Sequence, residues 1–531
     1  MVDITNAESP PAAARGARAG RRSGGRAGNQ RRGGGGVGHI TGQWHIPRRL
    51  DPPIEPLSAE QLETVFDAAY KVLETIGLEF MHAEARTILK KAGANVDEDT
   101  HRARIPREIV IEAMKSAPAE FTVTPRNPER VLPMGGNATV FAPIGSAPNC
   151  SDLDHGRRPG NTADFQKFVK LAQSFDCLHT IGGYPVEPID IHPSIRCLEA
   201  VSQKLILTDK AMHVYSLGEA YVEDGMEMVR LAAGLTEDEF CATPRMYTNI
   251  NTNSPLKVDI PMMDGPLRLA RRGQAVIITP FTLAGAMAPV TVLGAIVQQT
   301  AEFLGVATVL QLAAPGTPVV MGGFVSNVDM KSGAPAFGTP EFMRGAQVGG
   351  QIARRLGVPF RASNVNASNA VDAQSTWESA FSLWGILTGG VNYVLHGAGW
   401  LEGGLVASFE KYVIDCEMIQ WLNAYLKPLE FNEDALGLEA MAEVGPGGHF
   451  FGCAHTQARY ENAFHAPFLA DWRNFQSWEE DGALNATQRA NRIYKEVLDA
   501  YREPPMDSDA RGALEDYVGR RIAEGGSPTD F

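Results

Sequence analysis

The sequence predicts an α/β protein built on a TIM (β/α)8 barrel, with a helical extension before the barrel and a covering segment after it. Three observations carry this prediction: short apolar runs alternate with amphipathic stretches from Ala138 onward, the alternation is completed eight times, and no nucleotide-binding turn follows the first run. Eight strands, each followed by a helix, is the count of this barrel. An open doubly wound sheet is the alternative. Such a sheet usually carries a glycine-rich first turn, and Pro143–Pro148 is no such turn.

The expected strands are short apolar runs bounded by turn residues. They are Thr139–Ile144, Cys177–Gly182, Met212–Ser216, Met246–Ile250, Ala275–Thr279, Val319–Phe324, Pro359–Ser363 and Tyr393–His396. Amphipathic stretches follow them, with apolar residues at helical spacing. These expected helices are Ala163–Phe175, Ser194–Leu207, Tyr221–Ala233, Met262–Arg271, Thr291–Leu312, Glu341–Leu356, Ala373–Leu387 and Phe409–Leu426. Thr162 and Ser194 stand where N-caps are expected.

The chain divides into four parts on this interpretation. Residues 1–50 form a basic leader with many arginines and glycines, which cannot bury a core and is expected to be disordered. Residues 51–137 form an N-terminal helical extension, residues 138–430 the barrel, and residues 431–531 a C-terminal covering segment and helix. The helices expected outside the barrel are Leu57–Ile76, Ala83–Ala92, Pro106–Ala117 and Asn485–Tyr501.

Composition narrows the class of protein. Of the residues, 44% are hydrophobic and 21% charged, as in soluble globular proteins. There is no uninterrupted apolar run of about 18 residues, so we expect no membrane span, and the N-terminus lacks the apolar core of a secretory signal. The formal net charge is −14 despite the basic leader, which argues against nucleic-acid binding. The six cysteines have no paired spacing and indicate reduced thiols in the cytoplasm.

The active site of such a barrel lies at the carboxyl ends of its strands. The residues there are asparagines, hydroxyls and aromatics, with few carboxylate pairs or metal ligands. The substrate-binding candidates at or beside the mouth are Asn249, Asn251, Phe324, Asn364, Asn366, Asn369, Trp377 and Trp400. His396, followed by two nearby glycines, and Glu378, at the start of the seventh helix, are the catalytic candidates. The asparagines are also typical of turns, and the tryptophans of a core.

This set of side chains suits a methylated ammonium ion. A quaternary nitrogen has no N–H to donate, so aromatic faces recognise it. When a methyl group is transferred away, the leaving group is a neutral amine, so no general acid is needed to protonate it. The enzyme must only align the methyl carbon with an external nucleophile and exclude water.

The segment Gly445–Phe464, continued by Pro467–Gly482, combines glycines, two histidines, a cysteine and several aromatics. It is interpreted either as a cover packed on the core or as a loop that faces a ligand with His449 and His455. Together with Cys453 these histidines form a third alternative, a metal triad. Because their spacing matches none of the standard zinc patterns, we expect no metal.

This closing segment resembles the C-terminal signature of the trimethylamine methyltransferase family. Three further motifs strengthen the resemblance: GTPE at Gly338–Glu341, VDAQS at Val371–Ser375 with Glu378, and SFEKYVIDCE at Ser408–Glu417. It implies a TIM barrel that passes a methyl group from a methylated amine to the cob(I)alamin of a partner corrinoid protein. The cobalamin then belongs to the partner, and no tightly bound cofactor is expected in this chain.

One departure from the family pattern bears on the substrate. Trimethylamine-specific members carry pyrrolysine just before the stretch that resembles Asp372–Gln374, and Asn369 stands nearest that position here. The resemblance is therefore to the non-pyrrolysine branch, which includes glycine betaine methyltransferases, and a betaine-like quaternary amine is the first expected substrate. Asn364, Asn366 or His396 would bind its carboxylate. A methylamine-binding barrel without methyl transfer, and a metal-assisted hydrolase or lyase, are the alternatives, and a homo-oligomer is possible.

Overall fold

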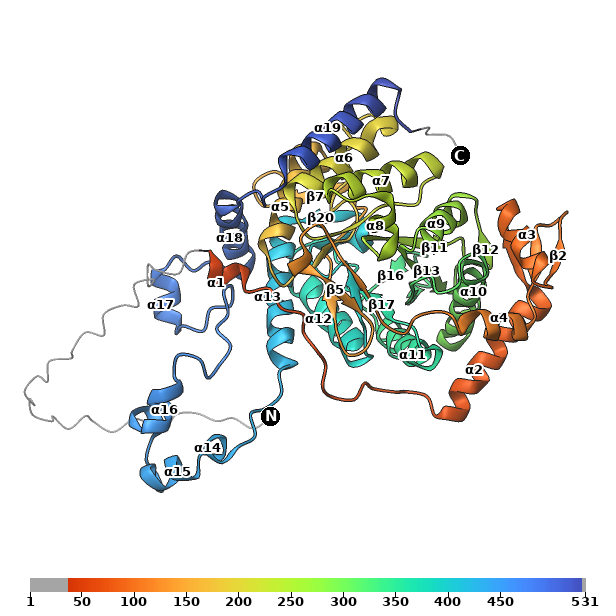
Figure 1. The fold of residues 1–531 in the computed structure, drawn as a ribbon. Helices are drawn as coiled ribbons and strands as arrows, with labels where there is room; N and C mark the ends of the chain where they lie inside the picture. Colours follow the sequence, from red (N-terminus) through yellow and green to blue (C-terminus); the bar gives the residue numbers. More distant parts are fainter. Residues whose placement is uncertain (1–36, 528–531) are drawn as a thin grey trace, which may run out of the picture. The chain divides into compact units, whose positions relative to one another are not determined.

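The computed structural model describes residues 37–527, and a barrel of parallel strands forms its centre (Figure 1). The sheet order is β6-β18-β17-β14-β13-β11-β10-β9, with every neighbouring pair parallel. The barrel strands are β6 (Val140–Phe141), β9 (Thr180–Ile181), β10 (Ala211–His213), β11 (Met246–Thr252), β13 (Ala275–Ala284), β14 (Val319–Gly322), β17 (Phe360–Ser363) and β18 (Tyr393–Leu395). β15 (Phe324–Val328) extends β14 along β13. All eight expected strands are confirmed.

The barrel closes between its first and second strands through a histidine. His179 donates its backbone N–H to the carbonyl of Phe141 (2.7 Å), and its ring Nδ1 accepts the N–H of Phe141 (3.0 Å). The other ring nitrogen then carries the proton and donates to the carbonyl of His45 (2.9 Å). Burial lowers the pKa of His179 to about 3, so the ring is neutral, as its acceptor role requires. Nearer the mouth, a parallel bridge joins Ala147 and Val186 across the same seam.

A helix follows each barrel strand, as expected, and Figure 1 shows these helices arranged around the strands. They are α5 (Thr162–Ser174), α6 (Pro193–Leu207), α7 (Glu219–Ala232), α9 (Pro261–Arg271), α10 (Val292–Ala313), α11 (Pro340–Leu356), α12 (Ala373–Thr388) and α13 (Phe409–Tyr425). A short extra helix, α8 (Glu237–Ala242), precedes β11. Two expected caps were wrong by one or two residues, because Asn161 accepts the N–H of Asp164 and Pro193 occupies a first-turn position after His192.

Helix α10 has the length and apolar composition of a membrane span, in the part of the chain that the structure describes. Most of its apolar window is buried inside the protein, between β13 and helices of the N-terminal extension. It is therefore placed as a core helix of the barrel.

The extension before the barrel is not purely helical, contrary to the sequence prediction. Helices α2 (Ala59–Lys71), α3 (Ala83–Lys91) and α4 (Arg107–Met114) are present, and a π-helical turn (Val72–Ile76) continues α2. Between them lies a small sheet, in the order β12-β1-β3-β2, and a hairpin follows. The strands of the sheet are β1 (Leu78–Phe80), β2 (Asn95–Asp97), β3 (Arg102–Arg104) and β12 (Lys257–Val258), the last of which follows β11 of the barrel. The separate hairpin consists of β4 (Phe121–Val123) and β5 (Leu132–Met134). Strands of two or three residues are too short to show alternation in a sequence.

The β4–β5 hairpin closes the amino end of the barrel. Its Val123, Leu132 and Met134 share one apolar cluster with residues that begin barrel strands, such as Ala211 and Ala275. Trp44 and Ile46 pack against the same cluster. The expectation of a disordered leader up to residue 50 is therefore wrong for residues 37–50, which include α1 (Gly38–Thr41); residues 1–36 lie outside the described part of the chain.

Two further groups of elements frame the carboxyl end and the outside of the barrel. A sheet in the order β19-β20-β7-β8 joins β19 (Trp400–Leu401) and β20 (Val406–Ser408) to β7 (Asn149–Asp152) and β8 (Gly156–Pro159). After the barrel come α14 (Glu433–Leu436), α15 (Leu438–Val444), a 3-10 turn (Phe450–Gly452), α16 (Ala454–Arg459) and α17 (Phe475–Glu480). The predicted closing helix is α18 (Ala486–Ala500), packed on α13, and an unexpected α19 (Ser508–Ala523) packs on α6 and α7.

A buried ion pair fixes α13 to the loop that follows β18. Lys411 and Asp415, one helical turn apart, are both fully buried and bonded to each other. Lys411 also donates to Ser379 of α12 (2.8 Å), and Asp415 accepts the N–H of Gly399 (2.9 Å). The pair thus joins two barrel helices to the loop that carries His396.

Replacing Lys411 by methionine should destabilise the protein strongly, because the buried carboxylate of Asp415 would lose its charged partner. Removing one member of a buried pair costs about 3–5 kcal/mol, and the urea midpoint of unfolding should fall accordingly. The double change Lys411→Met with Asp415→Leu removes both charges and should recover most of the loss. An unchanged midpoint for Lys411→Met would show that this pair does not hold α13 to the barrel.

Candidate active site

A cavity of about 570 Å3 opens at the carboxyl ends of the barrel strands. Residues from or just beyond all eight strands line it. They are Gly145 after β6, Gly182 after β9, His213 and Tyr215 at β10, Asn249 and Asn251 of β11, Phe281 of β13, Phe324 of β15, Arg361 of β17, and His396 and Trp400 after β18. This is the end at which barrel enzymes place their chemistry.

Aromatic rings form one wall of the cavity. The ring centroids of Phe281 and Phe324 are 4.7 Å apart, and those of His396 and Trp400 are 4.3 Å apart. Phe337 joins the two pairs, at 5.8 Å from Phe324 and 6.0 Å from Trp400. Faces of aromatic rings attract an alkylated ammonium group, which has no N–H to donate.

A buried arginine without a counterion lies in the same cavity. The Arg361 side chain is only 2% exposed, and its Nε and Nη1 have no hydrogen-bond partner among the described residues. Its guanidinium carbon lies 5.7 Å from the ring centroid of Phe324. Burial lowers the pKa of Arg361 to about 10, so the group still carries its charge at neutral pH. A buried, unpaired charge is costly, and an anion that enters the cavity removes that cost.

The two histidines of the cavity are neutral. Burial lowers the pKa of His213 to about 3, and burial together with the charge of Arg361 lowers the pKa of His396 well below its usual range. They can therefore donate or accept a hydrogen bond but do not add positive charge. His396 Nδ1 lies 3.2 Å from the Ser363 hydroxyl. Among the described residues that line the cavity, Arg361 is the one Lys or Arg side chain and Asp259 is the one carboxylate.

The backbone at His396 is held in a strained conformation. Its φ of +61° is left-handed, which costs a non-glycine residue of order 1–3 kcal/mol. The next residue supports this turn: Gly397 donates to the carbonyl of Ala142 (2.6 Å) and accepts from the Asn364 amide (3.0 Å). The strain turns the imidazole toward the cavity.

Four predicted asparagines divide into two pairs. Asn249 and Asn251 line the cavity, and the side-chain amide oxygen of Asn249 accepts a hydrogen bond from the Thr279 hydroxyl (2.9 Å). Asn364 and Asn366 are buried behind the lining instead. Asn366 donates to the Trp400 carbonyl (2.7 Å), and the Trp400 indole donates back to the Asn366 carbonyl (2.9 Å). The second pair therefore supports the loop that carries His396 and Trp400 and does not line the cavity.

Glu378, Trp377 and Asn369 are not brought to the cavity. The Glu378 carboxylate accepts the N–H groups of Ala367 (2.8 Å) and Ser368 (3.1 Å), so it holds the loop after β17. The structure does not bring Glu378 to the expected catalytic position at the mouth, because its carboxylate, in the second turn of α12, binds the loop that precedes this helix. Trp377 is about half exposed on the outside of α12, and Asn369 is exposed on the loop.

The closing segment does not cover this cavity within one chain. None of the described residues from Gly445 to Phe464 lines it. His449 is exposed, and His455 hydrogen-bonds the carbonyl of Asp434 (3.1 Å). Within the segment, α16 packs on the 3-10 turn, and just before it α14 packs on α15. The expected positions of both histidines at the mouth are therefore wrong for a single copy.

One cluster in the described part of the chain has the spacing of a metal site, formed by Asp152, Asp154 and His155. Its carboxylates already have cationic partners. Asp152 pairs with Arg158 (2.8 Å) and Asp154 with Lys495 (2.7 Å). The geometry of this cluster is that of a surface ion-pair network.

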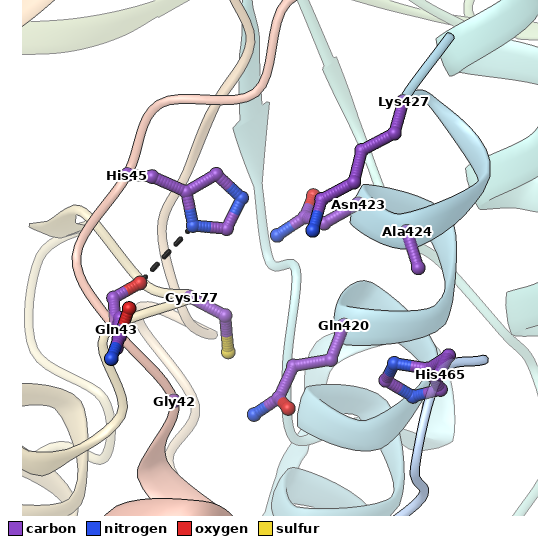
Figure 2. Close-up of a pocket in the computed structure, with 9 residues that line it drawn as sticks. All are labelled: Gly42, Gln43, His45, Cys177, Gln420, Asn423, Ala424, Lys427 and His465. Atoms are coloured by element: carbon purple, nitrogen blue, oxygen red, sulfur yellow. Dashed lines mark hydrogen bonds between the residues drawn. The ribbon is translucent and has the colours of Figure 1, made fainter. Parts of the chain in front are cut away.

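A second, polar cavity of about 260 Å3 lies beside α13 (Figure 2). Asn423 extends from the helix toward His45, with Gln420, Lys427 and His465 near it. Cys177, which also lines it, precedes β9, so this cavity lies toward the amino end of the barrel. It lacks the aromatic wall and buried charge of the mouth cavity, which is therefore the candidate active site.

The sequence prediction missed Arg361 and His213, although a usable signal was present. Alternate residues of a barrel strand face the interior. His213 and Tyr215 obey that alternation, as do Arg361 and Ser363. A charged or titratable residue inside an apolar strand of a barrel is unusual and marks an inward-facing functional position.

Comparison with known proteins identifies the family of this chain. The family described as trimethylamine methyltransferase (MTTB) matches residues 21–526. The chain is 34% identical to a glycine betaine methyltransferase of Desulfitobacterium hafniense strain Y51, over 90% of this chain and 99% of the relative. It is 28% identical to a trimethylamine methyltransferase of D. hafniense strain DCB-2, over 87% and 92%. The monomethylamine methyltransferase structure of Methanosarcina barkeri aligns at 12% identity and a TM-score of 0.49, over 88% of this chain and 89% of that one. By the extent of the family match and the identity to the first of these relatives, the chain belongs to the trimethylamine methyltransferase family and is a methyltransferase.

Proposed function

We propose that this methyltransferase demethylates a betaine-like substrate, a quaternary ammonium carboxylate, and passes the methyl group to the cob(I)alamin of a partner corrinoid protein. The buried, unpaired Arg361 is the observation that carries the proposal. It sits in a cavity that otherwise offers aromatic faces, neutral polar groups and one carboxylate, that of Asp259. A betaine combines the two matching features, because it carries a carboxylate for the guanidinium and methylated nitrogen for the rings.

The positions of these groups define a binding pose. Arg361 is buried within β17, whereas Ser146 and Asn251 are exposed at the rim. A carboxylate on Arg361 therefore places the ammonium group nearer the mouth, against Phe324 and Trp400. One methyl group then points outward, toward an acceptor arriving from solution.

The chain's contribution to the reaction is binding and alignment. The carbon–nitrogen bond breaks with its electron pair on nitrogen, so a neutral tertiary amine leaves and no proton is required. The neutral His213 and His396 suit this chemistry, since neither has to act as an acid. Alignment of the methyl carbon and exclusion of water supply the catalysis.

The corrinoid supplies a cobalt nucleophile to the methyl group when the partner protein is docked. The cavity volume is in the range of small-molecule pockets, roughly 300–1,000 Å3, and suits the amine. Ser146, Asn251 and Leu405 of the lining are exposed to solvent, so the mouth is open. These features fit a corrinoid that stays on the partner and approaches from outside.

Trimethylamine is the second candidate, favoured by several of the relatives, which are named trimethylamine methyltransferases. It has no carboxylate, so its binding would leave the buried charge of Arg361 without a partner. Asn369, nearest the pyrrolysine position, is exposed outside the cavity and supplies no group to an amine held there. Both points rank the betaine above trimethylamine.

Replacing Arg361 by glutamine should weaken glycine betaine binding about 30-fold or more, because truncating one partner of a buried charge pair costs about 2–5 kcal/mol. The affinity is measured by isothermal titration calorimetry, with Arg355→Gln as the matched control, since Arg355 pairs with Glu63 on the surface. Without ligand, Arg361→Gln should be as stable as the native protein or more stable, because a lone buried charge is lost. Unchanged betaine affinity would contradict the proposed role of Arg361.

Replacing Trp400 or Phe324 by leucine should weaken glycine betaine binding about 3- to 30-fold, from the loss of a cation–π contact of about 0.5–2 kcal/mol. Binding of 3,3-dimethylbutanoate, in which carbon replaces the charged nitrogen, should fall much less. The difference between the two ligands isolates the electrostatic contribution of the ring. Equal losses for both would mean that the rings act only by shape.

Methylcobalamin should form from free cob(I)alamin and a betaine, and far more slowly from trimethylamine. The reaction is followed by absorbance across a panel of betaines, choline and trimethylamine. Tight betaine binding with no methylcobalamin in the presence of the corrinoid protein would favour the alternative of a binding protein. Rapid turnover of trimethylamine with none for any betaine would overturn the substrate assignment.

A further inference from the structure

The segment between α13 and α17 exposes large apolar side chains. We call residues 428–464 the arm. Leu429, Phe431, Phe451 and Phe464 are each more than 80% exposed, and Leu436, Leu438, Met441 and Phe450 are about half exposed or more. Monomeric proteins rarely expose a contiguous apolar surface of this kind unless it binds something.

The arm is held together by its own contacts and not by the barrel. Arg459 pairs with Asp434, and α16 packs on the 3-10 turn. Of the described residues in the arm, none belongs to the main hydrophobic core. The chain joins the barrel again just beyond the arm, where Glu417 of α13 accepts the N–H groups of Phe468, Leu469 and Ala470. The exposed aromatics of the arm therefore do not stabilise their own barrel.

A second apolar surface lies on the outside of two barrel helices. Trp377, Phe381 and Trp384 recur at helical spacing on one face of α12 and are 40–54% exposed. Trp421 and Tyr425 occupy one face of α13 and are similarly exposed. The rings of Trp384 and Tyr425 are 5.1 Å apart, so the two helices present one continuous aromatic surface. We call these five residues the α12–α13 face.

We infer that two copies of this chain form a dimer in which the arm of each copy packs on the α12–α13 face of the other. Each chain carries both halves of the contact, and a two-fold arrangement buries both halves at once. The arm and the face together expose roughly 1,500 Å2 per copy, taking about 150–250 Å2 for a fully exposed large side chain. A stable interface needs about 800 Å2 from each partner.

The apolar character of both surfaces favours a second copy over a transient partner. Permanent interfaces resemble a protein core cut in half, whereas transient ones are smaller and more polar. A corrinoid protein that must dock and leave on each turnover would leave these side chains in water for much of the time. A permanent copy of the same chain covers them throughout. The proposal does not depend on which amine the cavity binds.

The mass of the full chain in solution tests the inference. Multi-angle light scattering at about 10 μM should give twice the single-chain mass of 57.4 kDa. The arm variant Phe431→Ser with Phe451→Ser, and the face variant Trp377→Ser with Phe381→Ser, should each fall to one copy at about 1 μM. The control variant Val290→Ser with Met330→Ser changes equally exposed apolar residues elsewhere and should keep the native mass. All three alter exposed side chains, so circular dichroism should report a folded barrel throughout.

A cross-link identifies the contact directly. With p-benzoylphenylalanine at position 451, ultraviolet light should join the arm to an α12 peptide of another copy, distinguished by mixing isotope-labelled and unlabelled chains. The face variant should abolish this product. A native protein of single-copy mass, arm and face variants that keep the native mass, or cross-links confined to one chain would each overturn the inference.

Discussion

Closure of the barrel between β6 and β9 is the constraint on which the rest of the structure depends. The two strands are too short to form a regular ladder, and His179 completes the seam with one backbone and one ring hydrogen bond. The ring can accept from Phe141 only while it is neutral, and burial ensures that it is. Closure brings the carboxyl ends of all eight strands to one place. Residues separated by 250 positions, such as Ser146 and His396, thereby line one cavity.

The interior below the cavity is filled, which sets the depth of the site. Tyr247 and Tyr393 hydrogen-bond each other (2.8 Å), and Tyr247 also contacts the hydroxyl of Thr180 (2.8 Å). The hairpin β4–β5 seals the amino end beneath them. Arg361, the neighbour of Tyr393 across the sheet, lies where this packed interior meets the cavity. A charge in that position has protein on one side and ligand space on the other.

The electrostatics of the cavity favour binding over proton transfer. Its cation has no internal partner, and its histidines stay neutral because burial and the same cation disfavour their protonation. The groups of such a site hold an anion and an alkylated cation at fixed positions. This is the requirement of a methyl transfer in which the leaving amine needs no acid, and it links the geometry to the family to which the chain belongs.

The closing segment shows how a strong sequence pattern can be assigned to the wrong place. Its glycines and aromatics indicate a packed segment, and the exposed Phe451 and Phe464 show that one copy of the chain does not provide the packing. A sequence records that a side chain is apolar but not whether the surface that buries it belongs to the same molecule. The catalytic prediction for Glu378 illustrates a similar limit. A glutamate suits catalysis by residue type, but in the structure its carboxylate binds the loop after β17.

The sequence by itself determined the eight strands, the helices between them and the end of the barrel that holds the site, because the alternation of apolar runs and helical patterns is a local property. It also placed Asn249, Phe324, His396 and Trp400 near the mouth, since each was expected at or just beyond the carboxyl end of a predicted strand. The tertiary structure alone decided which of the remaining candidates face the cavity. The short strands of the extension, the role of Asn366 behind Trp400 and the isolation of Arg361 depend on partners distant in the chain. Burial and the absence of a counterion are properties of the folded surroundings, and no local pattern encodes them.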